Sequence, residues 1–105
     1  MGDKYTSIFD KVMIKHLKRL SKNKHVKDII SKMLDKIEED GPKAGELLDS
    51  KLHIYEIKNK KPPIRLYFSH NILTNDIKVF EYEMKTNEKK QNQTIGKIKY
   101  KVLKS

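Results

Sequence analysis

The chain has 105 residues, a net charge of +10 and no cysteine. This length fits a single domain, residues 1–105, and the lack of cysteine excludes a disulfide framework, cysteine-ligated metal and thiol catalysis. No apolar run approaches the roughly 18 residues that a membrane span requires. We therefore expect a cytoplasmic protein without membrane association or a small-molecule cofactor.

The positive charge is concentrated in the second half of the chain. Residues 1–50 contain 11 basic and 9 acidic residues, whereas residues 51–105 contain 13 basic and 5 acidic residues, a net charge of +8. A one-sided positive field attracts polyanions, chiefly nucleic acid. The alternative is a lysine-rich solvated surface with no such partner.

Two helices are expected first, over residues 7–21 and 25–39, where apolar residues recur at helical spacing. Ser7 is the expected N-cap of the first helix. Gly41 and Pro42 should end the second, because glycine commonly follows a helix and proline cannot continue one. The short link predicts an antiparallel helical hairpin that packs its apolar face on the rest of the domain.

The apolar period then changes from 3.6 to 2 over residues 51–58, 64–69 and 77–84, with turn residues between them. Three consecutive strands with short links predict an antiparallel meander. Residues 95–103 fit a helix and a strand equally well. The expected fold class is α+β, with a helical hairpin on a small twisted antiparallel sheet and a C-terminal helix or strand.

Arg65 is the most informative basic residue, because the chain has only one other arginine, Arg19. It lies within a predicted strand, and its planar guanidinium suits a phosphodiester. Lys58 and Lys85 end the strands before and after it. The alternative is a solvated sheet face with scattered lysines. The histidines lack ligand spacing, so we expect no metal, and only His70, beside a turn, remains a functional candidate.

In order and spacing, these segments resemble the RelE/ParE toxin superfamily, in its HigB-like, phage-derived branch. Leu52 with residues 55–58 (Tyr-Glu-Ile-Lys) matches a strand that reads Leu-x-x-Tyr-Glu-Leu-Arg, with Lys58 in the arginine position. Residues 64–68 match Tyr-Arg-hydrophobic-x-Tyr, with Ile64 in place of the first tyrosine. Residues 82–86 match a strand ending Phe-x-Lys-Lys-Thr, with Met84 in place of the first lysine. The resemblance spans about residues 8–103.

The resemblance implies a metal-free, ribosome-dependent endoribonuclease that cuts messenger RNA and is paired with an acidic antitoxin. Arg65 would clamp the phosphate, with Lys58 and Lys85 as electrostatic partners. Glu56 would be a general base or a salt-bridge partner. Further RNA contacts are expected from Lys60, Lys61, Tyr67, His70, Lys89, Lys90 and Tyr100.

Three alternatives stay open at this point. The altered basic positions allow a weakened or inactive enzyme. The ParE branch inhibits DNA gyrase without a nuclease site. Outside the superfamily, the charge alone fits a basic nucleic-acid-binding module. Members often carry a Tyr or His near the C-terminus as an acid or stacking group, and Tyr100 is either that group or a packed helix residue.

Overall fold

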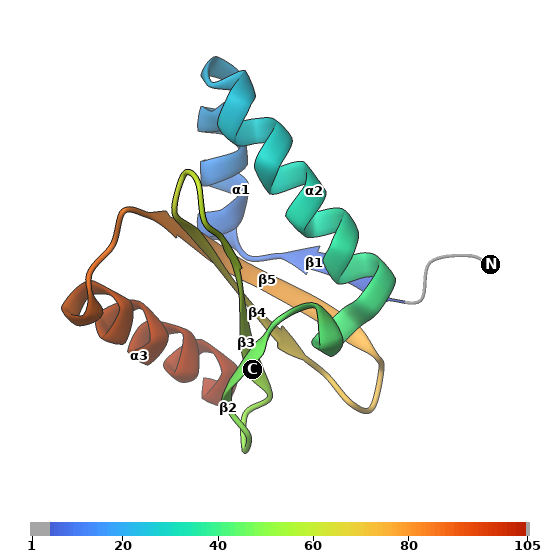
Figure 1. Ribbon diagram of the computed structural model, residues 1–105. Helices are drawn as coiled ribbons and strands as arrows, with labels where there is room; N and C mark the ends of the chain where they lie inside the picture. The colour runs from blue at the N-terminus through green and yellow to red at the C-terminus, as the bar shows by residue number, and fades with distance from the viewer. Residues whose placement is uncertain (1–4, 105) are drawn as a thin grey trace.

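A computed structural model of the chain describes residues 5–104, which form a five-stranded mixed sheet with helices on both faces (Figure 1). The sheet order is β1-β5-β4-β3-β2, with β1 parallel to β5 and the other neighbours antiparallel. The strands are β1 (Thr6–Phe9), β2 (Glu46–Asp49), β3 (Ile54–Asn59), β4 (Ile64–His70) and β5 (Asp76–Met84). The helices are α1 (Lys11–Arg19), α2 (Lys24–Asp40) and α3 (Glu88–Lys104). The predicted α+β class is confirmed.

The N-terminal boundary of the first predicted helix is wrong. Residues 6–9 form edge strand β1 beside β5, and Ser7 is a strand residue, not a cap. Asp10 caps α1 instead, because its carboxylate accepts a hydrogen bond from the Val12 N–H at 3.1 Å. Four residues are too few for periodicity to separate a strand from a helical turn, so pairing with β5 decides their structure.

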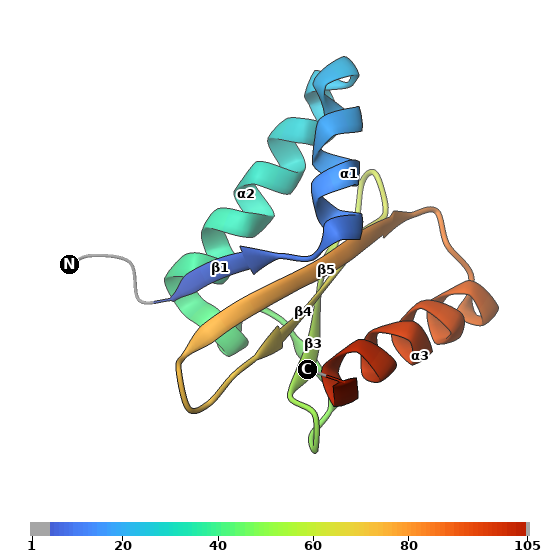
Figure 2. The ribbon, with the colours of Figure 1, turned by 180° about the vertical axis from the view of Figure 1, so that it is seen from behind.

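The second predicted helix is confirmed as α2. The Asn23 side chain caps its start by accepting from the Val26 N–H at 3.2 Å. Gly41 ends it with φ of 62°, where the ring of Tyr5 leaves no room for a side chain. Figure 2 shows α1 and α2 lying together on one face of the sheet, as the hairpin prediction requires.

The predicted meander is confirmed as β3-β4-β5, but the sheet is larger than predicted. Strand β2 was not predicted, and residues 51–53 form a turn rather than the start of β3. Asp49 fixes this turn, because its carboxylate accepts the N–H groups of Lys51 and Leu52 at 2.9 Å each. Asparagine and aspartate favour such turns through side-chain bonds to the following backbone.

Two buried clusters lie on opposite faces of the sheet. Helices α1 and α2 pack on side chains that include Leu66, Phe68 and Val79. On the other face, Ile98 of α3 packs with Ile54, Tyr67 and Phe80. Residues 95–103 are therefore helical, which resolves the predicted ambiguity. None of the helices in the described part of the chain combines the length and apolar composition of a membrane span.

Candidate functional site

Polar side chains form two rows across β3, β4 and β5 on the face that carries α3. Residues paired in register point to the same face of a sheet. The first row contains Lys58, Arg65 and Glu83. The second row contains Glu56, Tyr67 and Glu81. Three residues of the predicted site, Arg65, Lys58 and Glu56, are thus brought together by strand pairing.

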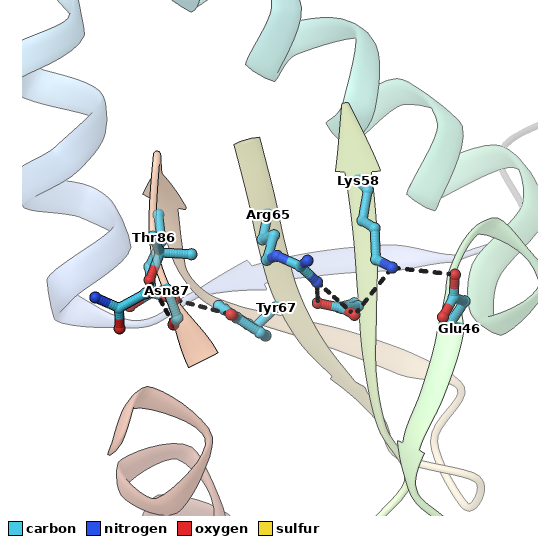
Figure 3. Close-up of polar contacts among 8 residues, drawn as sticks. Glu46, Lys58, Arg65, Tyr67, Thr86 and Asn87 are labelled. Atoms are coloured by element: carbon cyan, nitrogen blue, oxygen red, sulfur yellow. Dashed lines mark hydrogen bonds and ion pairs between the residues drawn. The ribbon is translucent and has the colours of Figure 1, made fainter. Parts of the chain in front are cut away.

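Arg65 is held by Glu56. Its Nη1 donates to both carboxylate oxygens of Glu56, at 2.9 and 3.0 Å (Figure 3). Glu56 is only 6% exposed, whereas the Arg65 side chain keeps 29% of its surface exposed. Only one of the guanidinium nitrogens makes a hydrogen bond to described residues, and a guanidinium has five N–H donors in all. Arg65 can therefore stay bonded to Glu56 and still present donors to an anion.

Lys58 lies on the strand next to Arg65, and we call these two residues the basic cluster. Its ammonium lies 3.8 Å from Glu56 and 3.5 Å from Glu46 of β2. Figure 3 shows Lys58 and Arg65 reaching toward one another from adjacent strands, with Glu46 beyond Lys58. Glu46 could not be anticipated, because β2 was not predicted. The two carboxylates balance the two cations, so the cluster is close to neutral in the free protein.

Lys85 and the β3–β4 turn border the cluster. The Lys85 N–H donates to the Pro63 carbonyl at 3.1 Å, and Lys85 has a φ of 50°, in the left-handed region that few non-glycine residues adopt. A cavity of about 250 Å³ lies beside Arg65 and is lined by Lys58, Asn59, Lys60, Pro63, Ile64, Arg65 and Thr86. Lys61 is exposed in the same turn.

Tyr67 is not on an accessible surface. It is fully buried, and its hydroxyl donates to Glu83 at 2.8 Å. Burial, followed by the bond to Glu83, raises the pKa of the Tyr67 phenol. Glu83 also accepts a hydrogen bond from the Thr94 hydroxyl of α3. Tyr67 therefore ties α3 to the sheet through Glu83 and does not present a stacking surface to RNA in this structure.

The remaining predicted RNA contacts are spread over the molecule. Lys89 and Lys90 are exposed at the start of α3. Tyr100 is 62% exposed on α3, so it is not a packed helix residue. His70 lies at the opposite end of β4 from Arg65, roughly 17 Å away along the strand. There it contacts Asn75 at 2.7 Å and the ring of Tyr5, apart from the basic cluster.

Two carboxylates of β5, Glu81 and Glu83, are buried close to this cluster, at 8% and 9% exposed, and sequence reasoning assigned neither a role. The sequence feature that could have singled them out is a pair of acidic residues, on either side of Tyr82, on one face of a predicted strand. Among residues 5–104, no group of three or more histidine, aspartate or glutamate side chains is arranged to hold a metal ion.

Solved toxin structures share this fold. The chain resembles the isolated RelE toxin of E. coli with a TM-score of 0.66 at 19% identity, over 90% of this chain and 99% of that one. It resembles a chain of the E. coli RelBE toxin–antitoxin complex with a TM-score of 0.65 at 20% identity, covering 80% and 100%. For the RelBE2 toxin–antitoxin complex of Mycobacterium tuberculosis, the TM-score is 0.63 at 13% identity, covering 82% and 100%.

The domain therefore has a RelE-like fold, as the order of its strand motifs led us to expect. No protein-family model matches the sequence, and no curated protein matches it. At these identities the likeness defines the fold alone, so the argument for function depends on the side chains described above.

Proposed function

We propose that this chain is the toxin of a toxin–antitoxin pair and cleaves messenger RNA on the ribosome. The observation that carries the proposal is the Arg65–Lys58 cluster on the sheet of a RelE-like fold. The strand motifs around these residues support a HigB-like, phage-derived branch. Cytoplasmic location follows from the substrate.

In the proposed reaction, the 2′-hydroxyl of the RNA attacks the adjacent phosphorus and loses its proton, while the bond to the 5′-oxygen breaks and that oxygen takes up a proton. Negative charge grows on the phosphate oxygens during this step. The unbonded donors of Arg65 and the Lys58 ammonium would stabilise that charge, because donors fixed before the reaction need no reorganisation. Lys85, which directly follows the end of β5, would add a third cation.

Glu56 fits the role of positioning residue better than that of general base. Both its oxygens accept from Arg65, and one also lies near Lys58. A general base needs a lone pair directed at the proton it removes. We therefore propose that the role of Glu56 is to orient Arg65. The proton of the 2′-hydroxyl then passes to another group or to water.

An antitoxin is the expected protein partner. Two of the similar structures are toxin–antitoxin complexes, and residues 51–105 carry a net charge of +8 that an acidic partner would complement. Opposite charges on two surfaces accelerate association and favour the correct partner. Tight binding to a small acidic protein from the neighbouring reading frame is the expected result.

The near-neutral state of the cluster in the free protein favours one alternative, a non-catalytic toxin of the gyrase-inhibiting type, whereas the net charge of +8 in residues 51–105 favours a second, a basic nucleic-acid-binding module. Purified protein added to translating ribosomes separates the readings. Under our proposal, messenger RNA is cut only when ribosomes are present. Intact messenger RNA together with inhibited DNA gyrase would support the first alternative.

A further inference from the structure

A second cleft, of about 390 Å³, lies along the open edge of β5. Strand β1 pairs only with residues 76–79, so residues 80–84 have no strand partner on that side within the described chain. Helices α1 and α3 flank this edge on opposite faces of the sheet (Figures 1 and 2). The cleft is lined by His16, Glu81, Tyr82, Glu83, Met84, Lys85, Thr86, Asn87, Lys90, Thr94 and Lys97.

Glu81 is the unusual group in this cleft. It is 92% buried, since 8% of its surface is exposed, yet it makes no hydrogen bond and no ion pair within 4 Å with described residues. Its neighbour Glu83 is equally buried but accepts bonds from Tyr67 and Thr94. Burial raises the pKa of the Glu81 carboxyl, and the nearby lysines Lys97 and Lys101 only partly oppose this. A carboxylate that makes no hydrogen bond and lines a cleft is a ready acceptor for a ligand's donors.

The wall of the cleft on the α1 side of the sheet edge, across from Glu81, is aromatic. The rings of His16 and Tyr82 lie 4.8 Å apart at 54°, and both line the cleft. Burial, and then the nearby charge of Arg19, lower the pKa of His16, which favours the neutral imidazole. Single-stranded bases are commonly bound by stacking on such rings and by hydrogen bonds to their Watson–Crick edges.

The cleft adjoins the cavity beside Arg65. Thr86 lines both this cleft and the cavity beside Arg65, and Lys85, Lys90 and Lys97 supply positive charge at the cleft itself. A nucleotide whose phosphate lies at Arg65 would therefore have a neighbouring base close to Glu81. Phosphate contacts of this kind position a strand, whereas contacts to the base select its sequence.

We propose that this cleft binds a guanine base of single-stranded RNA, with Glu81 accepting from the base and with His16 and Tyr82 as the stacking surface. Guanine is the base whose Watson–Crick edge presents two adjacent donors, N1–H and the 2-amino group. An ionised carboxylate offers two acceptor oxygens and no donor, so it matches that edge. The placement of the base in an RNA strand rests on the proposed function, whereas recognition of the base does not.

The test is a chemical-shift titration of the isotope-labelled full chain with the four nucleoside monophosphates. We expect the guanine nucleotide to bind most tightly and to shift the amides of Tyr82, Met84 and Thr94. Glu81→Gln should weaken guanine binding by about 5- to 150-fold, the range for one bidentate base contact. The matched control is Glu39→Gln, which removes an exposed carboxylate of α2 and should leave binding unchanged.

RNA pentamers with a single guanine extend the test to a strand. Tighter binding of the pentamer than of the mononucleotide supports a base site beside a phosphate site, and equal affinity contradicts it. A titration without base preference, or one unaffected by Glu81→Gln in a folded variant, overturns the inference even if the protein cuts RNA. Guanine binding that depends on Glu81 in a protein that cuts no RNA upholds the inference and refutes only the nuclease.

Discussion

Arg65 donates from a single nitrogen, Nη1, to both carboxylate oxygens of Glu56, and this pair joins the central strands β3 and β4. The geometry has two consequences. Glu56 is buried and depends on Arg65 for its strongest partner, since Lys58 lies farther away at 3.8 Å. The other guanidinium nitrogens stay available to bind an anion. Nη1 therefore contributes to stability, and the remaining nitrogens are the ones we expect to contribute to function.

Removal of Arg65 should therefore lower stability as well as activity. Arg65→Ala leaves the buried carboxylate of Glu56 without its main partner, and we expect the free energy of unfolding to fall by about 1–3 kcal/mol. The double variant Glu56→Gln/Arg65→Ala should recover most of that loss, because the unpaired charge is gone. Chemical denaturation of the variants measures this, and equal stability of wild type and Arg65→Ala would show that the pair contributes nothing.

The Thr94 hydroxyl should anchor α3 to the sheet. Thr94→Val keeps the shape of the side chain but removes its bond to the buried Glu83. We expect a loss of about 1–3 kcal/mol, the usual cost of leaving a buried polar group with one partner fewer. Thr94→Ser is the matched control, because it retains the hydroxyl. If Thr94→Val and Thr94→Ser unfold at the same denaturant concentration, the bond does not hold α3.

Glu81 should destabilise the protein at neutral pH. Its folded-state pKa is raised, by burial first, against the opposing charges of Lys97 and Lys101, with Glu83 and Asp10 adding to the rise. A raised carboxyl pKa favours the protonated form in the folded state, so its contribution is present at low pH and is lost as pH rises through the folded-state pKa. Glu81→Gln should thus be more stable than wild type at pH 7, and the gain should vanish below about 4.5, the ordinary glutamate value. Thermal unfolding across this pH range is the measurement, and a gain that persists at low pH would contradict the assignment.

RNA binding should weaken steeply with salt, because lysines that meet phosphates release condensed counterions. For a surface that makes several phosphate contacts, affinity for single-stranded RNA should fall by orders of magnitude between about 50 and 200 mM salt. Filter binding or fluorescence anisotropy at a series of salt concentrations gives the slope. A flat response would exclude an electrostatic RNA surface.

The elements predicted correctly are those whose own side chains fix their structure. The apolar stripe of α2 and its end at Gly41 are readable without knowledge of the rest of the chain. The same holds for the alternating strands β4 and β5. The edge strands β1 and β2 are short and half-exposed. Their formation depends on pairing with a neighbouring strand, which no local sequence pattern predicts.

The candidate site also has parts that could be predicted from the sequence and parts that could not. Arg65 and Lys58 could be selected by residue type and strand position, and the register then brings them together. The burial of Tyr67 could not be foreseen, because it depends on α3 crossing this face and on the irregular register between Tyr67 and Phe68. The burial of Glu81 without a hydrogen bond likewise depends on how α3 packs on this face of the sheet, which is a property of the tertiary structure.

The central claim is that Arg65 stabilises charge on the phosphate of messenger RNA during cleavage. The most direct measurement is the rate of messenger RNA cleavage on translating ribosomes by wild type, Arg65→Ala and Arg19→Ala. Arg19 is exposed on α1 and is the only other arginine, so its variant controls for the loss of one positive charge. We predict that Arg65→Ala lowers the rate by about 10²–10³-fold, the scale for one preorganised donor, while Arg19→Ala cuts as wild type does. Cleavage by folded Arg65→Ala at the wild-type rate, or equal losses in both variants, would contradict the account.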